Sequence, residues 1–247
     1  MIFLLKIKAF IKFYTELAVD NKASLIFTLL FPAIYQLFST KIITIFSAND
    51  FIKISMPMIA YIIVSTALNG VTMSIIATRN SGFIKAYFYA SGSRWAIYLA
   101  NLLVQLLIVI FENIIFTLAL MLLYKYYSAA LLIYLTLMTL ISFPIVSLGF
   151  NILFLFPIRQ SSLSILSTSL LLGFLVLFNI SIPNYFEVIK IINQIINPYV
   201  FISSILRILV MPDFSSFINI GITSFIYIFL GILGYQLFKL QNRGLEN

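Results

Sequence analysis

The chain contains no cysteine and no histidine among its 247 residues. Thiol nucleophiles, imidazole bases and most zinc ligands come from these residues, so a metalloprotease or a histidine-dependent hydrolase is close to excluded. The sequence also lacks a G-x-x-x-x-G-K-[ST] phosphate-binding loop. It therefore cannot hydrolyse ATP by that route, and we expect a chain that is not an enzyme and carries no cofactor of its own.

Charged residues are scarce, at 9% of the chain, whereas hydrophobic residues make up 62% and the mean hydropathy is +1.12. An ordinary globular protein has roughly 25% charged residues. Six apolar runs approach or exceed the length of about 20 residues that crosses a bilayer. They cover residues 24–45, 54–77, 95–123, 129–156, 163–182 and 214–238. The sequence predicts an all-α, polytopic membrane protein with six transmembrane helices in a single transmembrane domain, 1–247.

The basic residues divide unequally between the two sides of these spans. One side carries Lys6, Lys8, Lys12, Lys22, Arg79, Lys85, Arg94, Arg159, Lys239 and Arg243, and the other carries Lys41, Lys53, Lys125, Lys190 and Arg207. Because cytoplasmic loops are enriched in Lys and Arg, both termini are expected in the cytoplasm. The net charge of +8 is explained by this bias and by attraction to lipid headgroups, so we expect no nucleic-acid partner.

Residues 1–22 are predicted to hold an amphipathic helix, over 2–20, that lies in the cytoplasmic interface. Its apolar face is formed by Ile7, Phe10, Ile11, Tyr14, Leu17 and Ala18, opposite Lys8, Lys12 and Glu16. Spacings of three and four residues put each set on one side of a helix. A half-spanning anchor is the alternative.

The longest predicted cytoplasmic loop, 78–93, reads T-R-N-S-G-F-I-K-A-Y-F-Y-A-S-G-S. Gly82 and Gly92 bracket an insert that contains one basic residue and four aromatic ones. These are Lys85, Phe83, Tyr87, Phe88 and Tyr89. So many aromatic side chains in a short, polar-flanked loop require a partner, either lipid or protein. A simple interfacial loop is the alternative interpretation.

The opposite side has one long segment, 183–213, which is too short to cross the membrane twice. Its first part is amphipathic, Pro198 then breaks the helix, and a second apolar stretch follows. The pattern predicts two short helices that rest in the outer interface or dip into the membrane and return.

Glu112 is the acidic residue placed well inside a predicted span, near the middle of the bilayer. Asn101 and Gln105 share nearly the same helical face, and Asn113 lies beside it. An intramembrane carboxylate is costly and is a functional hypothesis by default. These residues indicate either a polar stripe on a translocation path or a proton relay, or else hydrogen-bonded contacts between helices with Glu112 protonated. A single carboxylate without charged partners favours the second interpretation.

The start of the fifth predicted span is rich in small hydroxyl side chains. They are Ser161, Ser162, Ser164, Ser167, Thr168 and Ser169, of which Ser161, Ser164 and Thr168 share a face. Small residues let helices approach closely in lipid, so tight packing is favoured, with pore lining as the alternative.

Three segments in this order are typical of one family. D-N-K-A-S-L-I-F-T-L-L-F-P opens the first run, S-R-W-A-I-Y-L-A-N-L-L follows the 78–93 loop, and I-P-N-Y-F-E-V-I-K-I-I-N-Q-I-I-N-P-Y begins the last outer segment. With the N-terminal helix, the layout over the whole chain resembles the type-two ATP-binding-cassette (ABC) export permeases. The family usually has acidic residues where Arg79 and Asn80 stand, and often a proline where Ser91 and Gly92 stand.

The resemblance implies the membrane subunit of an exporter. The segment 79–91 would be the coupling helix that docks on a separate ATPase subunit, which holds the ATP and Mg. The docking residues would be Arg79, Gly82, Phe83, Lys85, Tyr87 and Ser91. A second copy, or a sister permease, would pair with this chain in a bacterial cytoplasmic membrane. The weakly charged spans favour an amphipathic or hydrophobic cargo, such as a peptide or bacteriocin, a drug or a lipid-linked molecule. The alternatives are an immunity or signalling membrane protein without transport and an ion-coupled carrier that uses Glu112.

Overall fold

The computed structural model describes residues 2–20, 22–39, 47–180, 187–211 and 213–238. Within these ranges the chain forms helices and no strands, which confirms the predicted all-α class. The α-helices are α1 (Ile2–Asp20), α2 (Lys22–Ser39), α3 (Ala48–Ser65), α4 (Ser74–Asn80), α5 (Phe83–Ser91), α6 (Arg94–Tyr124), α7 (Ala129–Phe150), α8 (Leu163–Phe178), α9 (Glu187–Ile196), α10 (Pro198–Val210) and α11 (Phe214–Gln236). A π-helix, η1 (Thr66–Met73), joins α3 to α4, and η2 (Asn151–Leu155) and η3 (Gln160–Ser162) are short 3₁₀ segments.

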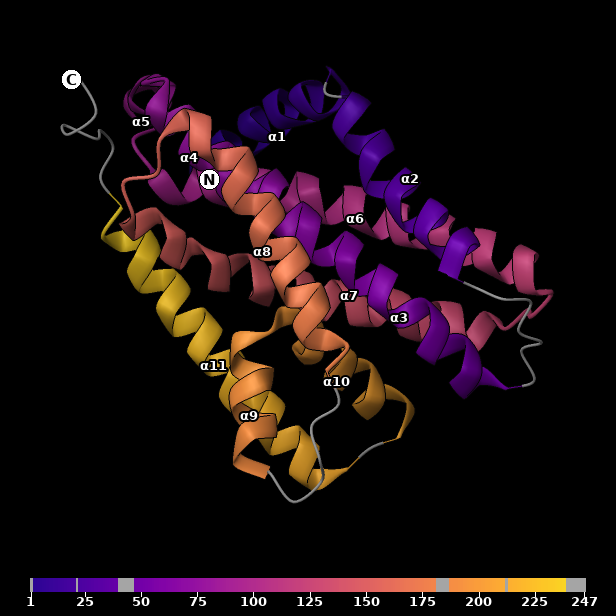
Figure 1. The fold of residues 1–247 in the computed structure, drawn as a ribbon. Coiled ribbons are helices and arrows are strands. Elements are labelled where there is room, and N and C mark those ends of the chain that lie inside the picture. The colour runs from indigo at the N-terminus through magenta and orange to yellow at the C-terminus, as the bar shows by residue number, and fades with distance from the viewer. Residues whose placement is uncertain (1, 21, 40–46, 181–186, 212, 239–247) are drawn as a thin grey trace.

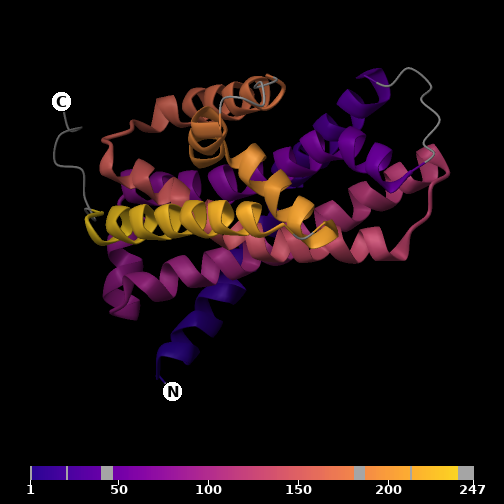
Figure 2. The same cartoon turned by 90° about the horizontal axis from the view of Figure 1, so that it is seen from below.

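Five helical segments in the described part of the chain are long and apolar enough to cross a membrane. They are Ala48–Asn80, Arg94–Tyr124, Ala129–Leu155, Gln160–Phe178 and Phe214–Gln236. At 1.5 Å per residue, even the 19-residue segment reaches about 28 Å, close to the thickness of the hydrocarbon core. The segments assemble into one bundle (Figure 1; Figure 2). This architecture indicates a multi-pass membrane protein, and five of the six predicted spans correspond to these segments.

The sixth predicted span, 24–45, overlaps α2, whose clearly apolar portion is 28–38, while residues 40–46 lie outside the described residues. Two side chains of α2 form hydrogen bonds with residues at two different positions along α6. The Thr28 hydroxyl donates to Glu112 Oε1 at 2.5 Å, and Gln36 Nε2 donates to the hydroxyl of Tyr124 at 3.0 Å. α2 therefore runs beside the second half of α6, but its crossing of the membrane stays a prediction.

Polar caps determine where four of the long segments begin. The side chains of Ser47, Ser93, Ser128 and Asp213 each accept a hydrogen bond from the backbone N–H three residues later. Such caps satisfy donors that the first helical turn leaves unpaired. The segment predicted at 54–77 accordingly begins earlier, at Ala48, and continues to Asn80.

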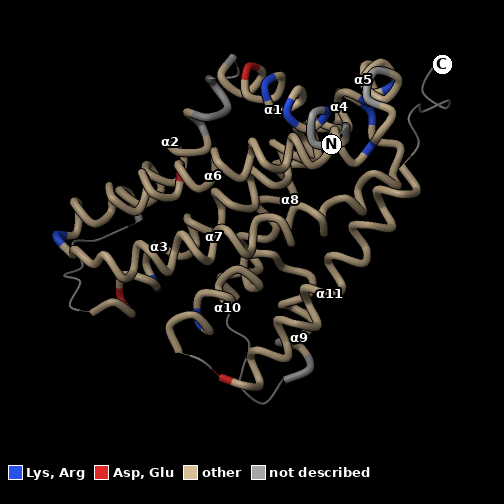
Figure 3. The backbone as a smooth tube through the Cα atoms, turned by 180° about the vertical axis from the view of Figure 1, so that it is seen from behind, with Lys and Arg blue, Asp and Glu red and all other residues tan. Residues whose placement is uncertain are grey.

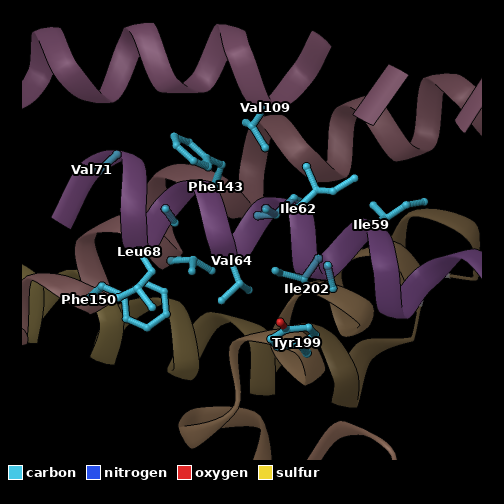
Figure 4. Close-up of a cluster of buried hydrophobic side chains, with 14 of the residues drawn as sticks. Ile59, Ile62, Val64, Leu68, Val71, Val109, Phe143, Phe150, Tyr199 and Ile202 are labelled. Atoms are coloured by element: carbon cyan, nitrogen blue, oxygen red, sulfur yellow. The ribbon is translucent and has the colours of Figure 1, made fainter. Parts of the chain in front are cut away.

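The helix formed by α3, η1 and α4 lies at the centre of the bundle. The most apolar 18-residue stretch of this helix is 78% buried inside the bundle. The corresponding stretches of the α8 and α11 segments are each 22% buried. Figure 4 shows Ile62 and Val64 of α3 among side chains from α6, α7 and α10, including Val109, Phe143 and Ile202. Because lipid tails are as apolar as these side chains, van der Waals packing holds the helices together more than water exclusion does.

Glycines allow α11 to lie directly on α7 and η2. A Cβ at Gly231 would collide with the carbonyl of Leu148, and one at Gly234 would collide with the carbonyl of Asn151. On α7, Gly149 faces the Tyr227 ring, to which a Cβ would come within 3.0 Å. Close backbone approach of this kind is a common way to join helices in lipid.

Residues 2–20 form the helix α1, and its predicted apolar residues are buried or half-buried except for Leu17. Tyr14 of α1 is buried in a cluster with Ile97, Ala100 and Val104 of α6, while Leu17 at the edge stays exposed. The predicted polar residues Lys8, Lys12 and Glu16 are exposed, and Lys12 forms an ion pair with Glu16 at 3.9 Å. The apolar face of α1 is therefore covered by α6, while its depth in a membrane stays a prediction.

The two helices predicted within 183–213 are α9 and α10, and residues 181–186 and 212 lie outside the described residues. Pro198 is the first residue of α10, where its missing N–H costs nothing. Asn197 caps this helix by accepting from Tyr199 N at 3.0 Å and ties it to α8 by donating to the Phe174 carbonyl at 2.9 Å. α10 packs against α3, α7, α8 and α11, so it enters the bundle instead of resting on its end.

Most basic residues of the described chain gather at the end that carries α1, α4 and α5 (Figure 3). The last described residues lie at this end as well, because Arg94 Nη1 donates to the Phe238 carbonyl at 2.9 Å. This distribution agrees with the charge count of the loops. The side of the membrane on which this end lies stays a prediction.

Candidate functional site

The predicted coupling segment begins at Arg79, near the end of α4. Its side chain is 3% exposed, and its guanidinium donates to the carbonyls of Phe154 at 3.1 Å and Phe156 at 3.3 Å. The guanidinium also lies over the Phe238 ring, 5.3 Å from its centroid. Asn80 continues this contact by donating to the Ile158 carbonyl at 3.0 Å. Arg79 therefore joins α4 to the end of η2 and does not face outward.

Two glycines with left-handed backbone set the direction of α5. Gly82 has φ +78° and precedes the helix, and Gly92 has φ +65° and ends it. Residues with a Cβ rarely adopt these angles, so the glycines allow the chain to turn sharply on both sides of a nine-residue helix. The bracketing glycines noted in the sequence thus form the two corners of the loop.

The aromatic residues of α5 divide between two faces. Tyr87 lies edge-on to Phe10 and Phe13 of α1, with ring centroids 6.0 Å and 5.2 Å apart, while Ile84 is buried beneath the helix. Phe83 and Tyr89 are 59% and 80% exposed. Burial raises the pKa of the Tyr87 phenol, which stays uncharged at neutral pH. α5 is therefore anchored to α1 on one side and presents exposed aromatic rings elsewhere.

The remaining predicted docking residues are Lys85 and Ser91. Lys85 is half-buried on α5. Ser91 is the last residue of the helix, and its side chain lies outside the described part of the structure. The segment thus brings Gly82, Phe83 and Lys85 together at one turn, while Arg79 lies inside the bundle.

The second candidate site is the intramembrane stripe formed by Asn101, Gln105, Glu112 and Asn113 of α6. Its members face the π-helix η1, α2 and α7. Asn101, Glu112 and Asn113 are buried, and Gln105 is half-buried. The structure therefore brings all four predicted residues to the inside of the bundle.

Glu112 is 3% exposed and receives hydrogen bonds from hydroxyl groups. Thr28 of α2 donates to Oε1 at 2.5 Å, and Thr66 of η1 donates to Oε2 at 3.3 Å. The ion pair found among the described residues joins Lys12 to Glu16, so no cation of the described chain pairs with Glu112. This arrangement joins three helices through one carboxyl group.

The other residues of the stripe contact η1, α4 and α7. Asn101 Nδ2 donates to the Gly70 carbonyl at 3.1 Å and to Ser74 Oγ at 3.0 Å. Gln105 packs on Gly70, where an added Cβ would lie 2.5 Å from Oε1. Asn113 Nδ2 donates to Thr139 Oγ1 of α7 at 3.1 Å. In a π-helix the α-helical bonding pattern is interrupted, and Asn101 supplies an outside donor for the Gly70 carbonyl.

Sequence reasoning missed the partners of this stripe on η1 and α7. These partners are the Thr66 hydroxyl and the Gly70 carbonyl of η1, and the Thr139 hydroxyl of α7. The repeated Thr, Asn and Ser of T-A-L-N-G-V-T-M-S inside an apolar run could have indicated the polar character of η1.

The small hydroxyl residues of α8 are arranged differently from the prediction of tight packing. Ser161 of η3 and Ser164 and Thr168 of α8 are exposed. Ser167 faces inward and donates to the Ser164 carbonyl at 3.0 Å. The reason is that Leu163, Leu171 and Leu175 occupy the buried face, which leaves the hydroxyls on the outer face.

Among the described residues, no group of three or more acidic side chains lies close enough to hold a metal ion. No protein-family model, curated protein or solved structure matches this chain. Any function must therefore be inferred from the residues and their geometry.

Proposed function

We propose that this chain is the membrane-spanning permease subunit of an ABC exporter in a bacterial cytoplasmic membrane. Separate ATPase subunits would bind and hydrolyse ATP with Mg, and this chain would have no catalytic role. The cargo would be amphipathic or hydrophobic, such as a peptide, a drug or a lipid-linked molecule, because the spans carry few charges.

One observation carries this proposal. A nine-residue helix, α5, stands between two long helices and is bounded by left-handed glycines. It presents Phe83 and Tyr89 without covering them. Exposed aromatic rings on a short, rigid helix suit a hydrophobic groove on a protein partner. If the resemblance of the sequence to export permeases holds, that partner would be the ATPase subunit.

The anchors of α5 suggest how a push from the ATPase would reach the spans. Tyr87 connects α5 to Phe10 and Phe13 of α1, and Arg79 connects the preceding α4 to the end of η2. A displacement of α5 would therefore move α4 and α1 together instead of bending the loop. Rigid-body motion of packed elements is a common form of such switching.

Pairing with a second permease copy or a sister permease is part of this proposal. The exposed hydroxyls of Ser161 in η3 and of Ser164 and Thr168 in α8 offer small side chains for close contact with another helix in lipid. α2 would be the sixth span, because its hydrogen bonds with Glu112 and Tyr124 place it beside α6 as far as the C-terminal end of that helix. Both termini would then lie in the cytoplasm.

The first experiment isolates the tagged protein from membranes of its host and identifies P-loop ATPases bound to it. Phe83→Ala and Tyr89→Ala should reduce the recovery of the ATPase and uncouple ATP hydrolysis from export. Phe38→Ala is the matched control, because Phe38 is 87% exposed on α2, away from α5. The isolated chain alone should hydrolyse no ATP.

Two results would contradict the exporter. Robust ATP hydrolysis by the purified polypeptide, free of other subunits, would contradict the proposal that separate ATPase subunits hydrolyse ATP. Stable binding of a peptide or protein partner with no ATPase and no transport would favour an immunity or signalling role instead.

An ion-coupled carrier is the second candidate, and the geometry of Glu112 is the observation that favours it. The carboxyl is buried and bound by the Thr28 and Thr66 hydroxyls, which tolerate either protonation state. In the exporter, Glu112→Gln should preserve assembly and export, because the amide oxygen can accept from one threonine hydroxyl and the amide N–H can donate to the oxygen of the other. Glu112→Leu should cost about 1–2 kcal/mol of helix association, since it leaves those hydroxyls unpaired.

The same variants separate the two candidates. A well-assembled Glu112→Gln protein that no longer transports, and whose activity Glu112→Asp restores, would favour the carrier. Transport should be measured in proteoliposomes with ATP and with a proton gradient as alternative energy sources.

A further inference from the structure

A polar cavity of about 440 Å³ lies between α9, α10 and the start of α11. These three elements come together at the lower part of the bundle in Figure 1, away from α5. Its volume lies within the range of ligand pockets, about 300–1,000 Å³. Side chains of Gln194, Ser203, Ser204 and Arg207 line it from α9 and α10. The cavity belongs to neither of the two sites described above.

Charges of both signs line this cavity. Arg207 projects from α10, and Asp213 stands immediately before α11. No ion pair within 4.0 Å joins these two residues in the described structure. Asp213 Oδ2 accepts from the hydroxyls of Ser215 at 2.6 Å and Ser216 at 2.9 Å. These bonds lower the pKa of Asp213 to about 2, so its carboxylate is ionised at neutral pH.

A buried amide lacks a partner at the same cavity. Gln194 is 8% exposed, and its Nε2 has no acceptor among the described residues. Leaving a buried donor without an acceptor is unfavourable, so an acceptor supplied by a ligand would stabilise this arrangement. Gln194 Nε2 and the Arg207 guanidinium together would donate hydrogen bonds to an anionic group.

The serines of α10 have the opposite capacity. Ser203 and Ser204 each donate their hydroxyl proton to the Val200 carbonyl, at 2.8 Å and 2.9 Å. Their oxygens therefore remain available as acceptors, as does the Asp213 carboxylate. The cavity thus combines donors for an anion with acceptors for a group that carries several N–H donors.

The cavity lies at the start of α11, a helix long enough to cross a membrane, so lipid headgroups would surround it. Asp213 caps a 23-residue apolar helix, which at 1.5 Å per residue is about 35 Å long and exceeds the hydrocarbon core. Phe214 and Phe217, in the first turn of α11, are 80% and 64% exposed. An acyl chain can contact these rings while its headgroup enters the cavity.

We propose that the cavity between α9, α10 and α11 binds the headgroup of a zwitterionic phospholipid with a primary amine, of the phosphoethanolamine type. The phosphate lies against Arg207 and Gln194, and the ammonium lies against Asp213 and the oxygens of Ser203 and Ser204. A choline headgroup fits less well, because its quaternary nitrogen has no N–H to donate. This binding does not depend on the proposed export function.

The test uses the full-length protein in detergent, titrated with phosphatidylethanolamine, phosphatidylcholine and phosphatidylglycerol of identical acyl chains. Native mass spectrometry counts the lipids that remain bound. The wild-type protein should retain phosphatidylethanolamine preferentially. Arg207→Gln and Asp213→Asn should each weaken that binding by about tenfold, the effect of losing one charged hydrogen bond. Asn is as good a helix cap as Asp, so Asp213→Asn should keep α11 intact.

The matched controls are Arg159→Gln, an exposed arginine elsewhere in the chain, and Asp50→Asn, an acidic residue in the first turn of α3. Both should bind phosphatidylethanolamine as the wild-type protein does, and circular dichroism should show all four variants folded. Equal retention of the three lipids, a preference for phosphatidylglycerol, or a phosphatidylethanolamine preference that survives both site variants would overturn the proposal. Binding of soluble glycerophosphoethanolamine as tightly as the lipid would overturn the assignment to a membrane lipid.

Discussion

The two ends of the bundle are built from short helices with opposite placements of charge and aromatic rings. At the α4–α5 end the cation Arg79 is 3% exposed, and the rings of Phe83 and Tyr89 face outward. At the α9–α10 end the Tyr199 and Phe201 rings are fully buried, and the cation Arg207 is exposed beside a cavity. A buried cation fixes one set of contacts, whereas an exposed one remains available to a ligand.

This difference separates a rigid end from an accessible one. α11 reaches both, and its glycines show the same contrast. Gly234 lies against the Asn151 backbone, whereas nothing lies within 4 Å of the Cβ position of Gly221. We therefore expect substitution of the buried Arg79 to affect stability, and substitution of the exposed Arg207 to affect ligand binding.

The largest effect is expected at Arg79. Arg79→Leu leaves the carbonyls of Phe154 and Phe156 without their donor in a buried place, and should lower the free energy of unfolding by about 3 kcal/mol. Arg207→Leu should change it by less than about 0.5 kcal/mol, because this side chain is exposed. Unfolding by SDS in lipid-free micelles measures both. Equal losses for the two arginines would break the comparison.

A smaller effect is expected along α11. Gly234→Ala should cost about 2 kcal/mol, because its Cβ overlaps the backbone of the opposing segment. Gly221→Ala should stabilise the protein by up to about 1 kcal/mol, because alanine is the better helix former and space is open. Thermal denaturation in one detergent compares them. A tolerated Gly234→Ala would show that α11 is not locked at its C-terminal end.

The smallest effect sharpens the description of the accessible end. The folded-state pKa of Asp213 is lowered to about 2 by hydrogen bonds from Ser215 and Ser216, below about 3.9 for a free aspartate. The cap therefore stabilises the folded state above the unfolded-state pKa, and this contribution is lost as pH falls through about 2. The melting temperature of wild type relative to Asp213→Asn should be constant from pH 7 to 5 and decline below about pH 4. If the melting temperatures of the two proteins change with pH in parallel, the Asp213 carboxylate does not stabilise the folded state in this way.

The sequence was sufficient to locate five spans, α1, and the break at Pro198, because each depends on the local apolar pattern or on backbone geometry. It did not place Arg79, since a cation beside a predicted loop is ordinarily expected outside, and only the folded η2 carbonyls reveal its partners. The split between Tyr87, packed on α1, and the exposed Phe83 depends on a helix far away in the chain. Glu112 was identified from its position in an apolar run, but Thr28 and Thr66 could not be, because several helices carry suitable hydroxyls.

The π-helix η1 has a geometric consequence for the whole central span. A turn of π-helix accommodates one residue more than a turn of α-helix, so everything after it is rotated by about 100°. The two halves of the span therefore direct their side chains toward different neighbours. Thr66 contacts Glu112 on one side of the span, and Arg79 contacts the end of η2 on another. Deleting one residue from 66–73 would straighten the helix and swing Arg79 away from both its carbonyl partners. The additional residue in η1 therefore sets the rotation of the second half of the span relative to the first half.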